Sequence, residues 1–148
     1  MTIFEKISAE IKVSMIAKDA DRLSALRMLK SAISYVQIER KNENLPDSEV
    51  IAIVQKEIKK RRDSVEQFEK GGRPELAEKE RQEIAVLEIF LPQAFTPAEL
   101  EALVKSVILE IGATGKKDMG GVIKAVQAKA AGRADGKSIS TLVGSLLP

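Results

Sequence analysis

The 148-residue sequence contains no cysteine and no histidine. Without cysteine, disulfide scaffolds and thiolate metal sites are excluded. Without histidine, the chain lacks the commonest general base and metal ligand, and with it every Ser/His or Cys/His catalytic arrangement. The remaining candidate catalytic groups are Asp, Glu, Lys, Ser, Thr and a single Tyr. The sequence therefore argues against a self-contained enzyme, and we assign it no cofactor.

Aromatic residues are also scarce: they make up 3% of the chain, and there is no tryptophan. The cores of β-sheets usually draw on aromatic and β-branched residues, whereas Ala, Leu, Ile, Glu and Lys dominate here. With 44% hydrophobic and 31% charged residues, the composition fits a globular protein. We therefore expect an all-α fold.

Long hydrophobic runs are absent as well. No apolar run approaches the ~18 residues that spanning a bilayer requires. The N-terminal segment carries Glu5 and Glu10 and lacks the apolar core of a signal peptide. We therefore expect a cytosolic protein with no membrane partner.

Apolar residues recur at helical spacing in four segments of the first 90 residues, which predicts helices over about 3–17, 22–43, 47–70 and 74–90. In the second of these, Met28 and Tyr35 widen the apolar arc to nearly half the circumference. A helix with so wide an arc usually lies between neighbours. Gly71 suits the left-handed position after a helix end, and the short Gly71-Gly72 connection predicts an antiparallel hairpin of the third and fourth helices.

Two prolines between residues 91 and 97 mark the predicted domain boundary. Pro92 disfavours helical geometry in the residue before it, and the Thr96-Pro97-Ala98-Glu99 sequence reads as a capping box. Three short amphipathic stripes follow, over residues 100–111, 119–130 and 139–146, and can close a small bundle. We predict a larger N-terminal domain of about four helices over residues 1–92 and a C-terminal three-helix bundle over residues 93–148.

Positive charge is concentrated near the end of the chain. Residues 1–111 hold 18 Lys and Arg against 20 Asp and Glu, whereas residues 112–148 hold 6 against 2, a net charge of +4. The free amides and the positive dipole end at the start of a helix attract phosphate, and glycines such as those between residues 112 and 121 let a ligand approach the backbone. The candidate contacts to RNA phosphates are Lys116, Lys117, Lys124, Lys129, Arg133 and Lys137. The alternative is a turn with solvated lysines in which Asp118 caps the helix and repels an anion.

Other charged stretches have structural explanations. Arg61 falls on the apolar side of its helix, so it should pair with a carboxylate inside the fold or extend outward, with an RNA contact as the alternative. The glutamates of the fourth helix spread around it and alternate with basic residues, so we assign no metal site. A DNA-binding helix-turn-helix over residues 97–131 is a minor alternative, because its turn over 112–117 is longer than usual.

The stretch 118–136 also carries a family resemblance. It reads DMGGVIKAVQAKAAGRADG and resembles the C-terminal signature of the YqeY-like proteins, which is shared with the tail of GatB, the B subunit of the tRNA-dependent amidotransferase. Three earlier stretches resemble the same family, so the resemblance covers essentially the whole chain: LSALRMLKSAI, KEIKKRRDSVEQF and LEIFLPQAFTPAEL. The residues that match the shared tail pattern are Asp118, Met119, Gly120, Gly132, Arg133, Ala134, Asp135 and Gly136.

The resemblance implies an all-helical fold with a larger N-terminal domain, and in the amidotransferase the tail domain contacts the outer corner of tRNA. Family labels also carry a carbon–nitrogen ligase activity with glutamine as amide donor, but this chain lacks the large catalytic portion of that subunit. We therefore predict a non-catalytic accessory protein that binds tRNA or another structured RNA. The alternatives are a protein-interaction module that docks on an aminoacyl-tRNA synthetase or amidotransferase subunit, and an amide-transfer enzyme.

Overall fold

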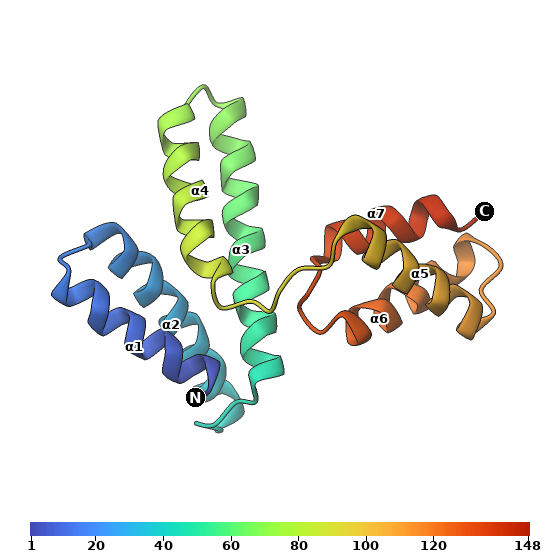
Figure 1. Ribbon diagram of the computed structural model, residues 1–148. Helices are drawn as coiled ribbons and strands as arrows, with labels where there is room; N and C mark the ends of the chain where they lie inside the picture. Colours follow the sequence, from blue (N-terminus) through green and yellow to red (C-terminus); the bar gives the residue numbers. More distant parts are fainter. The chain divides into compact units, whose positions relative to one another are not determined.

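The computed structural model describes all 148 residues and consists of helices joined by turns and loops (Figure 1). It contains no β-strand, which confirms the all-α fold. A single turn of 3₁₀ helix, η1 (Lys116–Asp118), leads into the sixth helix. The α-helices are α1 (Ile3–Ile16), α2 (Ala20–Arg40), α3 (Asp47–Lys70), α4 (Pro74–Glu88), α5 (Pro97–Ile111), α6 (Met119–Ala130) and α7 (Gly136–Leu146).

The helices form two compact units, each with its own hydrophobic core. Unit 1 is Met1–Leu91 and contains α1 to α4, and unit 2 is Pro92–Pro148 and contains α5 to α7. We predicted two domains, residues 1–92 and 93–148. That each of them folds independently stays a prediction. None of the helices combines the length and the apolar character that crossing a membrane requires.

The core of unit 1 is built from the inward faces of all four helices, and its fully buried side chains include Ile7, Leu26, Leu29, Val54 and Leu87. The capping box expected at the start of α1 is present, because Thr2 Oγ1 accepts from the Glu5 amide and Glu5 accepts from the Thr2 amide. The helices α3 and α4 pack side by side as an antiparallel hairpin, as predicted (Figure 1).

Arg61 lies inside unit 1, with 8% of its surface exposed. Its guanidinium pairs with Glu80 and Glu83 of α4. Nη2 also lies 3.6 Å from the sulfur of Met28 on α2. The prediction that this arginine pairs with a carboxylate inside the fold is therefore confirmed.

Three details of unit 1 differ from the predictions. The second helix ends at Arg40 rather than near residue 43, because Lys41 takes the left-handed conformation and the Asn42 amide donates to the Gln37 carbonyl. After α3, the left-handed residue is Gly72, with φ +71°, and not Gly71. On α2, Met28 and Tyr35 remain exposed, although the sulfur of Met28 contacts Arg61 of α3.

Unit 2 is a bundle of three helices in which each helix contacts the other two. Its core holds Val104 and Val107 of α5, Val122 and Val126 of α6, and Val143 of α7 among other residues. The capping box at the start of α5 is formed by Thr96 and Glu99, as predicted. Gly112 ends α5 in the left-handed conformation, with φ +75°.

Candidate nucleic-acid interface

The turn into α6 is held by a carboxylate that faces backward along the chain. Asp118 Oδ2 accepts a hydrogen bond of 2.9 Å from the Thr114 amide. No side chain caps the start of α6. The expectation that Asp118 caps this helix is therefore wrong: the 3₁₀ turn brings its carboxylate over the preceding loop and not over the first amides of α6.

Two glycines follow on the exposed surface of α6. A Cβ atom added to Gly120 or to Gly121 would have no heavy atom within 4 Å. Both residues are exposed, and so is Lys124, which lies one helical turn further along. The start of α6 therefore presents open backbone beside a lysine, which is an arrangement that suits an anionic ligand.

The structure separates the six predicted basic contacts into two groups. Three of them are engaged within unit 2: Lys116 Nζ donates to the Gly144 carbonyl, Lys129 pairs with Glu110, and Arg133 contacts the segment before α5. The other three are exposed and make no hydrogen bond or ion pair within the chain: Lys117, Lys124 and Lys137.

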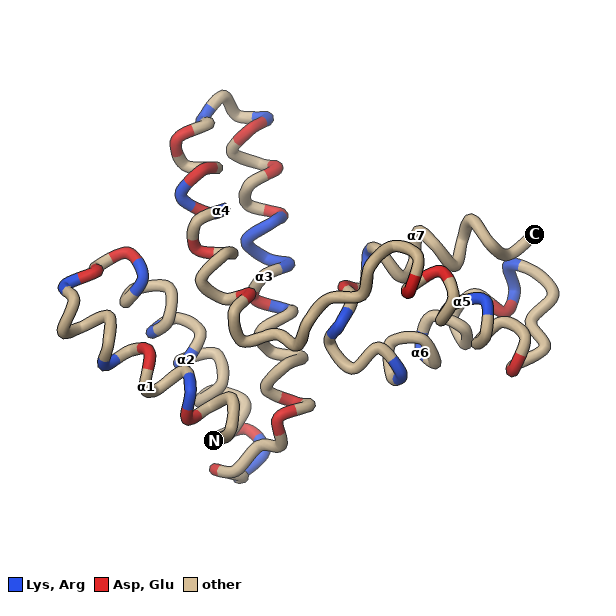
Figure 2. Tube along the Cα trace, viewed as in Figure 1, with Lys and Arg blue, Asp and Glu red and all other residues tan.

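Lys137 is brought toward α6 by the packing of α7. A Cβ atom on the preceding residue, Gly136, would lie 3.4 Å from Gln127 Nε2 on α6. Gln127 is one helical turn beyond Lys124 on the same exposed side. Two of the three unpaired lysines therefore lie near a common surface. Elsewhere in unit 2, Lys and Arg are distributed over several elements (Figure 2).

Arg133 has a structural environment that the sequence did not predict. Its guanidinium lies over the ring of Phe95, Nε donates to the Gln93 carbonyl at 2.9 Å, and Nη2 is 3.6 Å from Glu99 Oε2. Phe95 is the only aromatic residue of unit 2. The presence of a single aromatic ring in unit 2 was the one feature of the sequence that could have suggested Phe95 as the partner of Arg133.

The remaining residues of the tail pattern shape the turns of unit 2. Met119 is half-buried, and its methyl group lies 3.3 Å from the Cβ position of Gly144 on α7. Asp135 caps α7 by accepting a 2.6 Å hydrogen bond from the Ser138 amide. Gly132 adopts the left-handed conformation with φ +89°. These residues fix the connection between α6 and α7. Most residues of the tail pattern therefore have a structural role in unit 2.

Comparison with known proteins extends over nearly the whole chain. Residues 4–147 match the family model described as YqeY-like protein. A Lachancea thermotolerans protein named altered inheritance of mitochondria protein 41, mitochondrial, is 32% identical over 107 residues, covering 71% of this chain and 57% of that protein. The Pyrenophora tritici-repentis protein of the same name is 30% identical over 134 residues, covering 89% and 73%. The chain thus spans a little over half the length of the first of these relatives.

Both relatives are named as mitochondrial proteins, and this finding overturns the expectation of a cytosolic protein. That expectation depended on the absence of a hydrophobic export signal and of a membrane span, and neither feature distinguishes the cytosol from the interior of an organelle. The similarity itself is not confined to unit 2, since the family model begins in α1 and ends after α7. A match over this range, together with a relative covered over most of its length, shows that the chain belongs to the YqeY-like protein family.

Proposed function

We propose that this protein is a non-catalytic accessory protein that binds tRNA or another structured RNA through the exposed face of α6 in unit 2. The observation that carries the proposal is the start of α6. It has no side-chain cap, it exposes Gly120 and Gly121, and it lies between the unpaired Lys117 and Lys124. A phosphate can approach the backbone of such a helix start closely and is favoured there by the helix dipole.

The residues available in unit 2 favour recognition of the RNA backbone over recognition of bases. Base stacking on single-stranded RNA needs an exposed aromatic ring. Phe95 is the only ring in unit 2, and the guanidinium of Arg133 lies 3.9 Å from its centroid. Lysines and open backbone instead suit the phosphates and the shape of an A-form helix. We therefore expect weak dependence on RNA sequence.

The family resemblance supports the same proposal. The segment 118–136 resembles the tail of the amidotransferase B subunit, which contacts the outer corner of tRNA in that enzyme. The phosphate contacts that we propose are Lys117, Lys124 and Lys137, since Lys116, Lys129 and Arg133 already have partners inside unit 2.

The experiment is a titration of fluorescein-labelled tRNA with the full chain at two salt concentrations, followed by fluorescence anisotropy. If lysines meet phosphates, the logarithm of the association constant falls linearly with the logarithm of the salt concentration. The double variant Lys117→Glu/Lys124→Glu should weaken binding at least tenfold. The control is Lys105→Glu/Lys129→Glu, which changes the charge equally but removes lysines that pair with glutamates. Binding that ignores salt, or equal losses in both variants, would contradict the proposal.

A further inference from the structure

The last residues of unit 1 are held by their own unit up to the point where the chain leaves it. The Phe90 side chain is 7% exposed and belongs to the core of unit 1. Leu91 packs against the same core, and its amide donates to the Glu88 carbonyl at 3.1 Å. The backbone of unit 1 is therefore fixed as far as Leu91.

Contacts with unit 2 begin only two residues later, at Gln93. Its carbonyl accepts a 2.9 Å hydrogen bond from Arg133 Nε in the turn between α6 and α7. Phe95 packs against the core of unit 2, its ring lies against the Arg133 guanidinium, and its amide donates to the Arg133 carbonyl. The side chains of Gln93 and Ala94 are exposed. Arg133 therefore holds a stretch of chain that buries little surface of its own.

Only Pro92 lies between these two fixed stretches, and a proline makes a stiff joint. Its ring holds the φ angle at about −65°, and the residue before a proline is confined to extended conformations. The main free rotations between the units are thus those about the ψ angle of Pro92 and the φ angle of Gln93.

We infer that the two units reorient as rigid bodies about a hinge of one residue, Pro92, and that the Arg133 side chain keeps this hinge short. Without the guanidinium, the next contacts along the chain are those of Phe95 itself, so the free stretch grows from Pro92 alone to residues 92–94. A longer free stretch allows more orientations, because the end-to-end distance of a flexible chain grows with the square root of its length. Arg133 is then a positioning residue for the connection, a role that is independent of RNA binding by unit 2.

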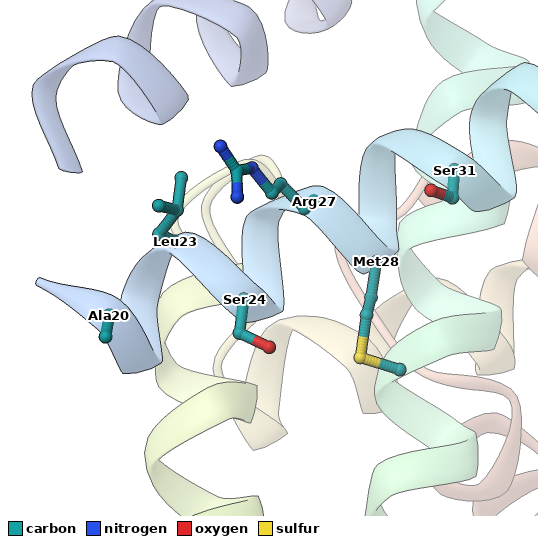
Figure 3. A pocket seen from close by; sticks show the side chains of 6 residues that line it. All are labelled: Ala20, Leu23, Ser24, Arg27, Met28 and Ser31. Carbon is teal, nitrogen blue, oxygen red and sulfur yellow. The ribbon is translucent and has the colours of Figure 1, made fainter. Parts of the chain in front are cut away.

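The test measures distances between spin labels on the two units of the full chain. Because the chain has no cysteine, two introduced cysteines are the only sites that are labelled. Ser31→Cys places one label on α2, where Ser31 is exposed and lines an open hollow formed by residues of α2 alone (Figure 3). Thr141→Cys places the other at an exposed position of α7. Double electron–electron resonance then gives the distribution of distances between the labels.

We expect Arg133→Ala to widen this distribution by about 1.5-fold, in line with the longer free stretch. Lys137→Ala is the matched control, because it removes one positive charge from unit 2 without touching the contacts of Arg133, and its distribution should keep the original width. Pro92→Gly should widen the distribution while those contacts stay intact, because glycine frees the φ angle that proline fixes.

Amide NMR spectra of the same variants report whether unit 2 stays folded. For Arg133→Ala we expect shifts confined to residues near positions 93 and 133. The inference is overturned by an unchanged width in Arg133→Ala, by equal widening in Lys137→Ala, by an unchanged width in Pro92→Gly, or by widening that accompanies loss of the folded spectrum of unit 2.

Discussion

The guanidinium of Arg133 lies 3.9 Å from the centre of the Phe95 ring. The contact is reinforced along the backbone, since the Phe95 amide donates to the Arg133 carbonyl at 2.9 Å. Arg133 Nε donates in turn to the Gln93 carbonyl, 40 positions earlier in the chain. One arginine therefore ties the segment before α5 to the turn between α6 and α7.

We expect Arg133→Ala to loosen this connection. The variant loses a cation–π contact and a charge-assisted hydrogen bond, together about 1–2 kcal/mol of the free energy of unfolding of unit 2 at a partly exposed site. Amide hydrogen exchange by NMR should show faster exchange at the Phe95 amide. Lys137→Ala serves as the control, because Lys137 has no partner in the chain. Unchanged exchange at Phe95 would show that the backbone bonds alone hold the segment.

A larger loss is expected from Arg61→Met. This change leaves Glu80 and Glu83 facing each other without their cation, with only 21% and 12% of their side chains exposed. Removing one partner of a buried ionic cluster typically costs about 3–5 kcal/mol. Urea unfolding followed by circular dichroism measures the loss.

Two further variants check that the loss of stability comes from burial. Adding Glu80→Gln and Glu83→Leu to Arg61→Met should recover most of the stability, because the uncompensated charges are then gone. Arg62→Met should change the free energy of unfolding by less than about 0.5 kcal/mol, since Arg62 and Glu88 are both about half exposed. A loss from Arg62→Met equal to that from Arg61→Met would refute the account.

The salt dependence of RNA binding should identify which lysines meet phosphates. Lys124→Ala is expected to weaken RNA binding and to lower the slope of log affinity against log salt by about 0.7–0.9, the value for one lost phosphate contact. Lys129→Ala removes the same charge from the same helix, but its ammonium pairs with Glu110 and should contribute less. Equal slopes for both variants would indicate a diffuse electrostatic attraction in place of a defined site.

Gly121→Ala should separate stability from RNA binding. Gly121 lies inside α6 with open space around its Cβ position, so alanine should raise the free energy of unfolding by about 0.5–1 kcal/mol. The added methyl group also covers the backbone at the proposed phosphate contact, and we expect weaker RNA binding from a more stable protein. Thermal unfolding and anisotropy, measured on the same preparation, test both parts. Undiminished RNA affinity would place the contact elsewhere on unit 2.

The sequence by itself determined where the helices lie. The boundaries of α3 at Asp47 and Lys70 and the capping boxes at Thr2 and Thr96 follow from residues within four positions of one another. The inward position of Arg61 also follows from helical angle alone. Local periodicity and capping fix these features because a helix is built from contacts between near neighbours in sequence.

The tertiary structure decided which charged groups have partners. Arg61 meets carboxylates 19 and 22 positions away, and Arg133 meets a carbonyl 40 positions away. The same packing left Lys117, Lys124 and Lys137 unpaired. No local pattern encodes these outcomes, because the side chains are brought together only when the helices pack. The position of every candidate lysine could thus be read from the sequence, but whether it is available to RNA depends on the fold.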